Sequence, residues 1–179
     1  MAASHYEHLE EHVKEFFWQL GLEVAVEPRG SRGPDLESAS PNRNGAPAFV
    51  GEIKHDEELQ RDLRSAFWSN WNNPNLAFGG KTKGYVLRDA ESLDRAVEEL
   101  SAPALGFVAT VMGQLKHYVR SAGLDEGWLV VENHSRWEPP LREALDALRR
   151  FGHLASFSMV SDEYGIGYVR IRFCMVKGR

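Results

Sequence analysis

Several features of common protein classes are missing from this 179-residue chain. Its single cysteine, Cys174, excludes an internal disulfide framework and any metal centre built on four cysteines. No apolar run approaches the roughly 20 residues that span a bilayer. The N-terminus lacks a basic stretch followed by an apolar one, and no phosphate-binding loop motif is present. We therefore expect a cytoplasmic protein with no membrane partner and no ATPase site of its own.

Size and composition favour one globular domain. A chain of 179 residues is long enough to bury one core and short for two. Apolar residues make up 42% of it and charged residues 26%, and these proportions are those of an ordinary globular protein. We therefore treat residues 1–179 as a single domain.

The net charge of the chain gives no support for binding to nucleic acid. The formal net charge is -5, whereas proteins that bind the phosphate backbone are usually basic. Carboxylates that bind a metal count as negative until the metal is present, so net charge does not exclude nucleic acid. Positive side chains are concentrated locally, and we take these as candidate nucleic-acid contacts: Arg29, Arg32, Lys81, Lys83, Arg170 and Arg172.

Hydrophobic periodicity predicts a mixture of helices and strands. Helical spacing covers 6–20, 57–71, 89–100, 103–121 and 141–151. Strand patterns cover 22–26, 35–37, 49–54, 128–132, 154–160 and 168–176. Turn residues between 35–37 and 49–54 predict a hairpin, and 72–84 is predicted as a loop. The order predicts a mixed α/β sandwich, in which helices flank a central sheet.

The most informative stretch runs from Gly33 to Lys54. It places Asp35 on the first strand of the predicted hairpin and Glu52 and Lys54 on the second. Alternate side chains of a strand share a face, so Glu52 and Lys54 point together while Ile53 points into the core. With Asp35 on the partner strand beside them, two carboxylates and one ammonium would converge on one spot.

This set of groups suits a divalent metal. Mg²⁺ prefers oxygen ligands and keeps several waters, so Asp35 and Glu52 suffice to anchor it, and the carbonyl of Ile53 is a candidate further ligand. A bound metal lowers the pKa of its water and stabilises charge on a phosphate. Lys54 would orient or deprotonate the attacking water, or stabilise the developing negative charge, and the sequence leaves these roles open.

The combination of Pro34-Asp35 with Glu52-Ile53-Lys54 resembles the PD-(D/E)XK nuclease superfamily, whose motif is Pro-Asp followed by Asp/Glu-x-Lys. The resemblance covers about residues 6–132. It implies a restriction-endonuclease-like three-layer sandwich, with 133–179 as an additional helix and hairpin. It also implies Mg²⁺- or Mn²⁺-dependent hydrolysis of DNA phosphodiester bonds, in which Asp35 and Glu52 bind the metal and Lys54 is catalytic.

Two predicted helices carry further matches to this superfamily. Glu10 lies on the apolar stripe of the first helix, at a spacing similar to that of the family's helix-borne acid, and would support a second metal or a water. Gln114 and Tyr118 resemble the QxxxY element of the RecB-like branch. Residues four apart share a helix face, so both side chains are expected to aim at the metal site or the substrate.

The resemblance leaves the biological role open. RecB-like features favour DNA repair, recombination, or phage or plasmid defence, with a DNA end, a junction or a specific duplex sequence as the substrate. A second copy of the chain and a separate helicase or ATPase subunit are candidate partners. The four-cysteine iron–sulfur cluster of some RecB-like nucleases is excluded by the single cysteine.

Two interpretations from other classes compete. The first is a non-catalytic nucleic-acid-binding or structural module that keeps the nuclease fold, and the intact acidic and lysine motif argues against it. The second is a zinc protease, because His8, Glu11 and His12 match the inverted pattern H-x-x-E-H. No third ligand with a recognisable motif follows, so the alternative for these histidines is a polar helix face.

Two other groups of residues have a structural and a functional interpretation. Aromatic side chains beside two lysines would form a stacking platform for bases, although such spacing is more often that of a core: Trp68, Trp71, Phe78, Lys81 and Lys83. Arg170 and Arg172 alternate with apolar residues and so share one face of a strand. That face would be solvated, would contact DNA or would form a dimer edge.

Overall fold

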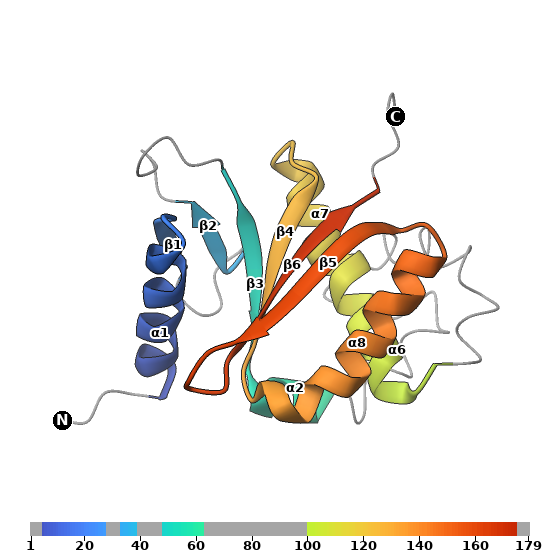
Figure 1. The fold of residues 1–179 in the computed structure, drawn as a ribbon, viewed down its shortest axis with the longest axis horizontal. Helices are drawn as coiled ribbons and strands as arrows, with labels where there is room; N and C mark the ends of the chain where they lie inside the picture. Colours follow the sequence, from blue (N-terminus) through green and yellow to red (C-terminus); the bar gives the residue numbers. More distant parts are fainter. Residues whose placement is uncertain (1–4, 28–32, 39–47, 63–99, 175–179) are drawn as a thin grey trace.

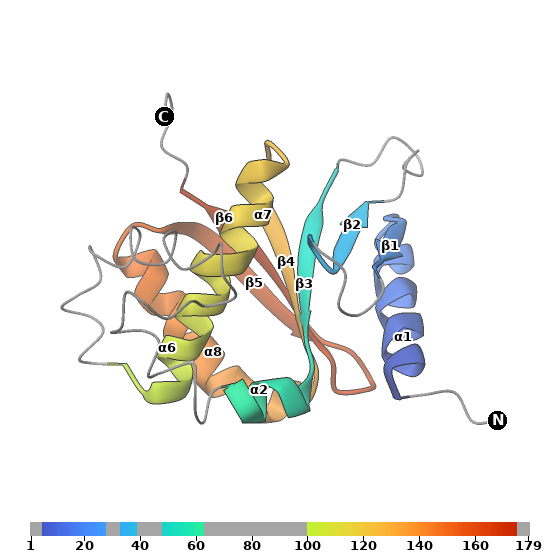
Figure 2. The same ribbon diagram turned by 180° about the vertical axis from the view of Figure 1, so that it is seen from behind.

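The structure, a computed structural model, describes residues 5–27, 33–38, 48–62 and 100–174 of the chain. Within these ranges one mixed sheet has six strands, in the spatial order β1 (Val24–Val26), β2 (Leu36–Ser38), β3 (Val50–Lys54), β4 (Glu126–Val131), β6 (Gly167–Phe173) and β5 (Leu154–Ser161). Figures 1 and 2 show this sheet from two sides. The predicted mixed α/β class is confirmed.

The helices of the described ranges are α1 (His5–Gln19), α2 (Asp56–Asp62), α6 (Ala102–Thr110), η4 (Val111–Leu115), α7 (Lys116–Ser121) and α8 (His134–Arg150). Helix α1 lies at the β1–β3 end of the sheet, and α6 and α8 lie together at the other end (Figure 1). None of these helices has the length and apolarity that a membrane span requires.

Strand pairing makes β3 and β4 the centre of the sheet. They pair in parallel, whereas the β1–β2, β2–β3, β4–β6 and β5–β6 pairs are antiparallel. A Cβ on Gly51 would come within 2.7 Å of the Trp128 carbonyl oxygen, so glycine permits the close approach of β3 to β4. The C-terminal hairpin, predicted as an addition to the core, continues the same sheet because β6 pairs with β4.

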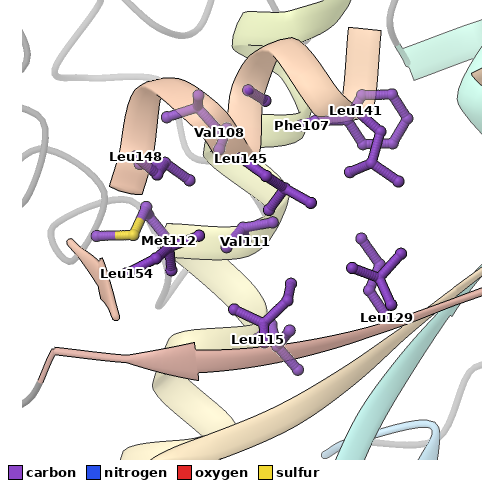
Figure 3. Packing of buried hydrophobic residues seen from close by; sticks show 14 of the residues in the cluster. Phe107, Val108, Val111, Met112, Leu115, Leu129, Leu141, Leu145, Leu148 and Leu154 are labelled. Atoms are coloured by element: carbon purple, nitrogen blue, oxygen red, sulfur yellow. The ribbon is translucent and has the colours of Figure 1, made fainter. Parts of the chain in front are cut away.

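Two buried clusters define the two faces of the sheet. The cluster on what we call the α1 side includes Leu9, Val13, Phe17, Leu36, Phe49, Ile53, Trp128, Val130 and Tyr168. The cluster on the α8 side (Figure 3) includes Val50, Phe107, Val108, Val111, Met112, Leu115, Leu129, Val131, Leu141, Leu145 and Ile171. Alternate residues of β3 and β4 therefore enter opposite clusters, as the period of a strand requires.

Two helices differ from their predicted form. The predicted helix over 103–121 is present, but η4 interrupts it with a π turn, in which the Lys116 N–H donates to the Val111 carbonyl five residues earlier. Helix α8 begins at His134, seven residues before the predicted start, and runs through Pro139 and Pro140. Prolines inside a helix remove backbone hydrogen bonds, so the prediction began the helix after them.

Several predicted elements fall wholly or partly outside the described residues. Helix α2 extends to Asp62, and the remainder of the predicted 57–71 helix lies outside. The 72–84 loop and the 89–100 helix lie outside as well. The same holds for the predicted stacking platform of Trp68, Trp71 and Phe78.

Candidate active site

Strand β3 carries two charged side chains into the interior. Val50 packs on the α8 side and Ile53 on the α1 side, so strand alternation places Glu52 and Lys54 together on the α8 side. Their exposed fractions are only 5% and 8%. Glu and Lys are almost never fully buried unless they are paired, so β3 departs from an ordinary core strand. The predicted geometry of Glu52, Ile53 and Lys54 is confirmed.

The register of the hairpin holds Asp35 beside this pair. Leu36 pairs with Gly51, so Asp35, the residue before β2, lies opposite Glu52. Asp35 Oδ2 accepts a hydrogen bond from the Ile53 N–H at 2.9 Å. In an antiparallel pair the N–H and C=O of one residue point to the same neighbouring strand, so the Ile53 carbonyl points toward the β2 side of β3. Two carboxylates and an ammonium therefore lie together, as predicted.

Burial and neighbouring charges shift the pKa values of Glu52 and Lys54. Burial raises the pKa of Glu52 well above its ordinary value of 4.5, and the positive charge of Lys54 offsets this only in part. The Asp35 carboxylate, which also hydrogen-bonds to Glu52, and the Glu58 carboxylate raise that pKa further. Burial lowers the pKa of Lys54, but the charges of Glu52 and Glu58 outweigh it and raise the pKa above 10.5.

Glu58 on α2 is a third acidic group, which the sequence patterns did not reveal. Lys54 Nζ donates a hydrogen bond to Glu58 Oε1 at 3.2 Å. The Glu58 side chain is 21% exposed and that of Lys54 is 9% exposed, so Glu58 links the buried pair to the surface. The available signal was the acidic first turn of α2, but acids at that position equally suit the helix dipole.

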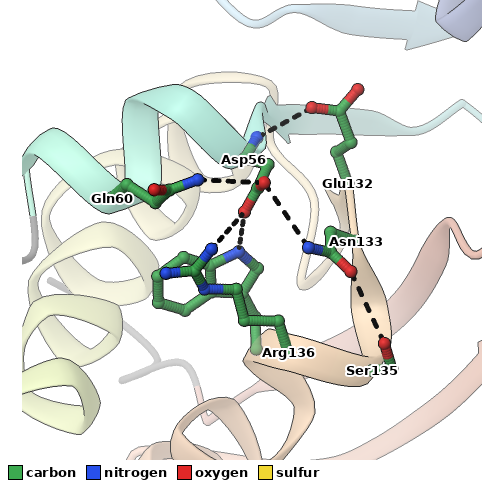
Figure 4. Close-up of polar contacts among 7 residues, drawn as sticks. Asp56, Gln60, Glu132, Asn133, Ser135 and Arg136 are labelled. Atoms are coloured by element: carbon green, nitrogen blue, oxygen red, sulfur yellow. Dashed lines mark hydrogen bonds and ion pairs between the residues drawn. The ribbon is translucent and has the colours of Figure 1, made fainter.

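A polar network at Asp56 fixes the chain where β3 ends (Figure 4). The Asp56 carboxylate accepts hydrogen bonds from Trp137 Nε1 at 2.8 Å and from Gln60 Nε2 at 3.0 Å. Its backbone N–H donates to Glu132 Oε1 at 2.9 Å. The Glu132 N–H in turn donates to the Lys54 carbonyl at 3.0 Å. The network thus joins the ends of β3 and β4 to the starts of α2 and α8.

The η4–α7 helix brings Gln114 and Tyr118 to the α8 side of the sheet. Burial raises the pKa of Tyr118, and the charges of Glu52 and Asp35 raise it further. The Tyr118 hydroxyl therefore lies within electrostatic reach of both carboxylates. Gln114 lies on the π turn, and its Oε1 is buried with no hydrogen-bond partner among the described residues. A role for Gln114 and Tyr118 at the metal site or the substrate stays a prediction.

Asp35 and Glu52 fit a divalent metal ion. Glu52 Oε1 is buried and has no hydrogen-bond partner in the described part of the chain, and a buried acceptor without a donor is costly. A cation on the two carboxylates would satisfy this oxygen, and Mg²⁺ needs no more than one or two carboxylates because it keeps several waters. Within the described ranges no group of three or more His, Cys, Asp or Glu forms a metal cluster.

Glu10 is not one of the groups that act on the buried pair. The buried stripe of α1 runs through Leu9, Val13 and Phe17, and Glu10 lies half-buried beside it. The acids that raise the pKa of Glu52 are Asp35 and Glu58. Helix α1 also packs on the face opposite Glu52 and Lys54, so a role for Glu10 at the metal stays a prediction.

The candidate nucleic-acid contacts divide into two sets. Arg29, Arg32, Lys81 and Lys83 lie outside the described residues. Arg170 and Arg172 lie on the α1 side of the sheet, opposite the buried pair. Arg170 forms two hydrogen bonds to Glu126 and lies over the Trp128 ring, 5.7 Å from its centroid. Arg172 Nε lies 3.9 Å from Asp125 Oδ2. Both arginines therefore have acidic partners.

Of the three predicted zinc-protease residues, His8 and His12 line a cleft of about 680 Å³ between α1, α2 and the β5–β6 turn, and Glu11 does not. The His12 ring stacks on Tyr164 with centroids 3.5 Å apart, and His8 is exposed. Within the described ranges, to which the lining of this cleft belongs, no three His, Cys, Asp or Glu residues are grouped so that they could hold a metal. The arrangement is that of a polar helix face.

Comparison with protein-family models, with curated proteins and with solved structures gives no match for this chain. The resemblance to the PD-(D/E)XK nucleases rests on the residues themselves. These are Asp35 and Glu52-Ile53-Lys54 on adjacent strands, with Gln114 and Tyr118 on the helix of the same side.

Proposed function

We propose that this protein is a metal-dependent nuclease that hydrolyses phosphodiester bonds of DNA with Mg²⁺ or Mn²⁺. The observation that carries the proposal is the buried group of Asp35, Glu52 and Lys54, in which one Glu52 oxygen lacks a donor. Burying charges without full compensation costs several kcal/mol per ion. A site of this kind is therefore explained by chemistry rather than by stability.

The topology supports the finer assignment to a restriction-endonuclease-like fold. An N-terminal helix precedes the antiparallel run β1–β2–β3, and a helix of the other face then leads to β4, which pairs in parallel with β3. This order supports the three-layer sandwich that the resemblance implies. The acidic and lysine residues lie on β3 and at the start of β2, the strands that the motif requires.

Each residue then has a defined part in the proposed reaction. Asp35 and Glu52 would hold the metal, together with the Ile53 carbonyl on the same edge. When bound, the ion supplies an activated water and charge neutralisation at the phosphate. Lys54, held as an ammonium by Glu52 and Glu58, is a hydrogen-bond donor suited to the attacking water or to the developing negative charge. Gln114 and Tyr118 would position the scissile strand.

Cleavage of linear duplex, closed circular and single-stranded DNA with Mg²⁺ or Mn²⁺ tests the proposal. Lys54→Met keeps the apolar stem and removes the ammonium, and we expect it to lower the rate about 10²–10³-fold, as loss of one electrostatic group does in other enzymes. Lys14→Met is the matched control, because Lys14 is exposed on α1. Sparing of circles would show dependence on DNA ends.

A second readout separates metal binding from cleavage. Calorimetric titration with Mn²⁺ should show binding by the wild type and a large loss in Glu52→Gln. Equal cleavage by wild type, Lys54→Met and Glu52→Gln would overturn the proposal, as would a wild-type protein that binds neither metal. Metal binding without cleavage of any DNA would instead favour a non-catalytic module.

A further inference from the structure

The start of α2 places an acidic side chain next to the end of β3. The Leu59 N–H donates to the His55 carbonyl at 3.0 Å, so the helix begins directly after Lys54, the last residue of β3. Glu58 lies in the first turn of this helix and accepts a hydrogen bond from Lys54 Nζ at 3.2 Å. Glu58 is therefore in direct contact with a residue of the candidate active site, although it lies on a different element.

Two acids act on Lys54 in different ways. Burial acts to lower the pKa of Lys54, Glu52 raises it through its charge, and Glu58 raises it through both its charge and a side-chain hydrogen bond. The side-chain hydrogen bond of Glu52 is with Asp35. Glu58 is thus the acid that fixes the position of Lys54 Nζ, while Asp35 and Glu52 form the carboxylate pair that suits a metal.

This contact differs from an ordinary ion pair at the start of a helix. An acid in the first turn interacts favourably with the helix dipole, but Asp56 and Glu57 already occupy the same turn. An exposed Lys–Glu pair contributes little to stability, but the Lys54 side chain is only 9% exposed. A buried donor that loses its partner is costly, so Glu58 constrains Lys54 more strongly than an exposed partner would.

The backbone that carries Glu58 is held from two sides. Leu59 is 2% exposed and packs in the cluster on the α8 side. The Asp56 carboxylate accepts a hydrogen bond from Trp137, and the Asp56 N–H donates to Glu132 (Figure 4). A group is positioned precisely only when the residues that support it are themselves fixed. Glu58 meets this condition.

The proposed reaction requires a partner for Lys54 that does not bind the metal. Once Asp35 and Glu52 held a divalent cation, they would no longer compensate the ammonium, and the two cations would repel each other. The acids that act electrostatically on Lys54 are Glu52, Glu58 and Asp35, so Glu58 is the one left to hold it. An ammonium has three N–H donors, so a bond to Glu58 leaves donors for the water or the phosphate.

We propose that Glu58 is a positioning residue of the active site, which holds Lys54 Nζ beside the metal-binding carboxylates without being a metal ligand. The inference rests on the proposed nuclease function, because it specifies how one group of that site is placed. Glu58 acts through Lys54, so its contribution to the reaction must vanish when the ammonium is removed.

The rate of DNA cleavage with Mg²⁺ tests the effect of this contact. Glu58→Ala should lower kcat by about 10²-fold, as misplacement of a catalytic group does, and should leave KM nearly unchanged. Glu58→Gln keeps an acceptor oxygen at the same position and should recover part of the loss. Glu57→Ala is the matched control, because it removes an exposed acid from the same turn, and it should cleave like the wild type.

Double variants separate positioning from a general loss of structure. In the Lys54→Met background, Glu58→Ala should cause no further fall in kcat, because groups that act as a unit are not additive. In metal-free protein, Glu58→Ala should lower the urea midpoint of unfolding more in the wild-type background than in the Lys54→Met background. Calorimetric titration with Mn²⁺ should show a far smaller loss of affinity in Glu58→Ala than in Glu52→Gln.

The outcomes distinguish this inference from the proposed function. An active wild type whose Glu58→Ala variant keeps its kcat overturns the inference alone, as does a further fall in kcat when Glu58→Ala is added to Lys54→Met. A loss of Mn²⁺ binding as large as that of Glu52→Gln would make Glu58 a ligand and overturn it as well. A wild type that cleaves no DNA overturns the proposed function and any catalytic part for Glu58, and the urea midpoints then still decide whether Glu58 holds Lys54.

Discussion

Two acid–base pairs lie near the centre of the same sheet and differ in nearly every physical respect. Glu52 and Lys54 are buried on β3, and one oxygen of Glu52 has no hydrogen-bond partner among the described residues. Glu126 and Arg170, on β4 and β6, are 25% and 52% exposed in their side chains, and the guanidinium bonds both carboxylate oxygens. The exposed pair, Glu126 and Arg170, is therefore the one in which both carboxylate oxygens have a hydrogen-bond partner.

The difference separates a pair that stabilises the fold from a pair that the fold tolerates. An exposed ion pair contributes about 0–1 kcal/mol and costs little to desolvate. A buried pair loses several kcal/mol of hydration per ion and is often no better than apolar residues of the same volume. The exposed pair therefore needs no function to explain it, whereas the buried pair, with Asp35 added to it, does.

The largest expected effect is the loss of the buried cation. Lys54→Met leaves Glu52 buried beside Asp35 without its main compensating charge, and we expect the free energy of unfolding to fall by about 3 kcal/mol. Arg170→Met, the matched change in the exposed pair, should cost less than about 1 kcal/mol. Urea denaturation at neutral pH with a chelator present measures both. Equal losses would remove the distinction between the two pairs.

Removal of the buried anion should act in the opposite direction. Glu52→Gln abolishes the repulsion from Asp35 and Glu58 and the cost of a buried charge, while Lys54 keeps Glu58 as its partner. We expect about 1 kcal/mol of added stability without metal, as is common where function rather than stability dictates a residue. Glu126→Gln should lower stability slightly. A destabilised Glu52→Gln protein would show that Glu52 is a structural residue.

The pH dependence of stability should report the same buried charge. The pKa of Glu52 is raised in the folded protein, so the folded chain holds a proton at pH values where the unfolded chain has released it. Stability therefore falls as the pH rises from about 4.5 through the raised pKa. Lys54 titrates above 10.5 and does not enter this window.

The difference between wild type and Glu52→Gln isolates this contribution. His134, whose pKa is lowered mainly by burial, acts in the opposite sense, because its stability contribution is lost as the pH falls below 6.5. Both proteins contain His134, so subtraction of their stability curves removes it. A difference that does not change with pH would show that Glu52 titrates normally.

The sequence alone was sufficient to predict those parts of the site whose geometry follows from the regular repeat of a strand or a helix. Alternation along β3 placed Glu52 and Lys54 together because the period of a strand is two. The facing position of Asp35 followed from one antiparallel hairpin. Four-residue spacing likewise placed Gln114 and Tyr118 near one face, even though the π turn was not predicted.

The remaining features depend on contacts between distant segments. Glu58 reaches Lys54 because the chain turns from β3 into α2, and the Asp56 network that fixes this turn includes Trp137, 81 positions away. The same contact anchors the first turns of α8 ahead of Pro139. Arg170 lies on the face opposite Lys54 because the register of β6 against β4 pairs it with Trp128, and no local pattern in the sequence specifies that register.

The smallest expected effect is that of salt concentration on the energy of the exposed ion pair. A double-mutant cycle between Glu126 and Arg170 should give a coupling of less than about 1 kcal/mol. Counterions screen exposed charges, so the coupling should decline toward zero in molar salt, where the screening length is about 3 Å. The stability difference between wild type and Lys54→Met should change much less over the same range, because the buried ammonium and carboxylate exclude counterions. Equal salt sensitivity would mean that solvent reaches β3 as freely as β6, and the comparison between the two pairs would then rest on geometry alone.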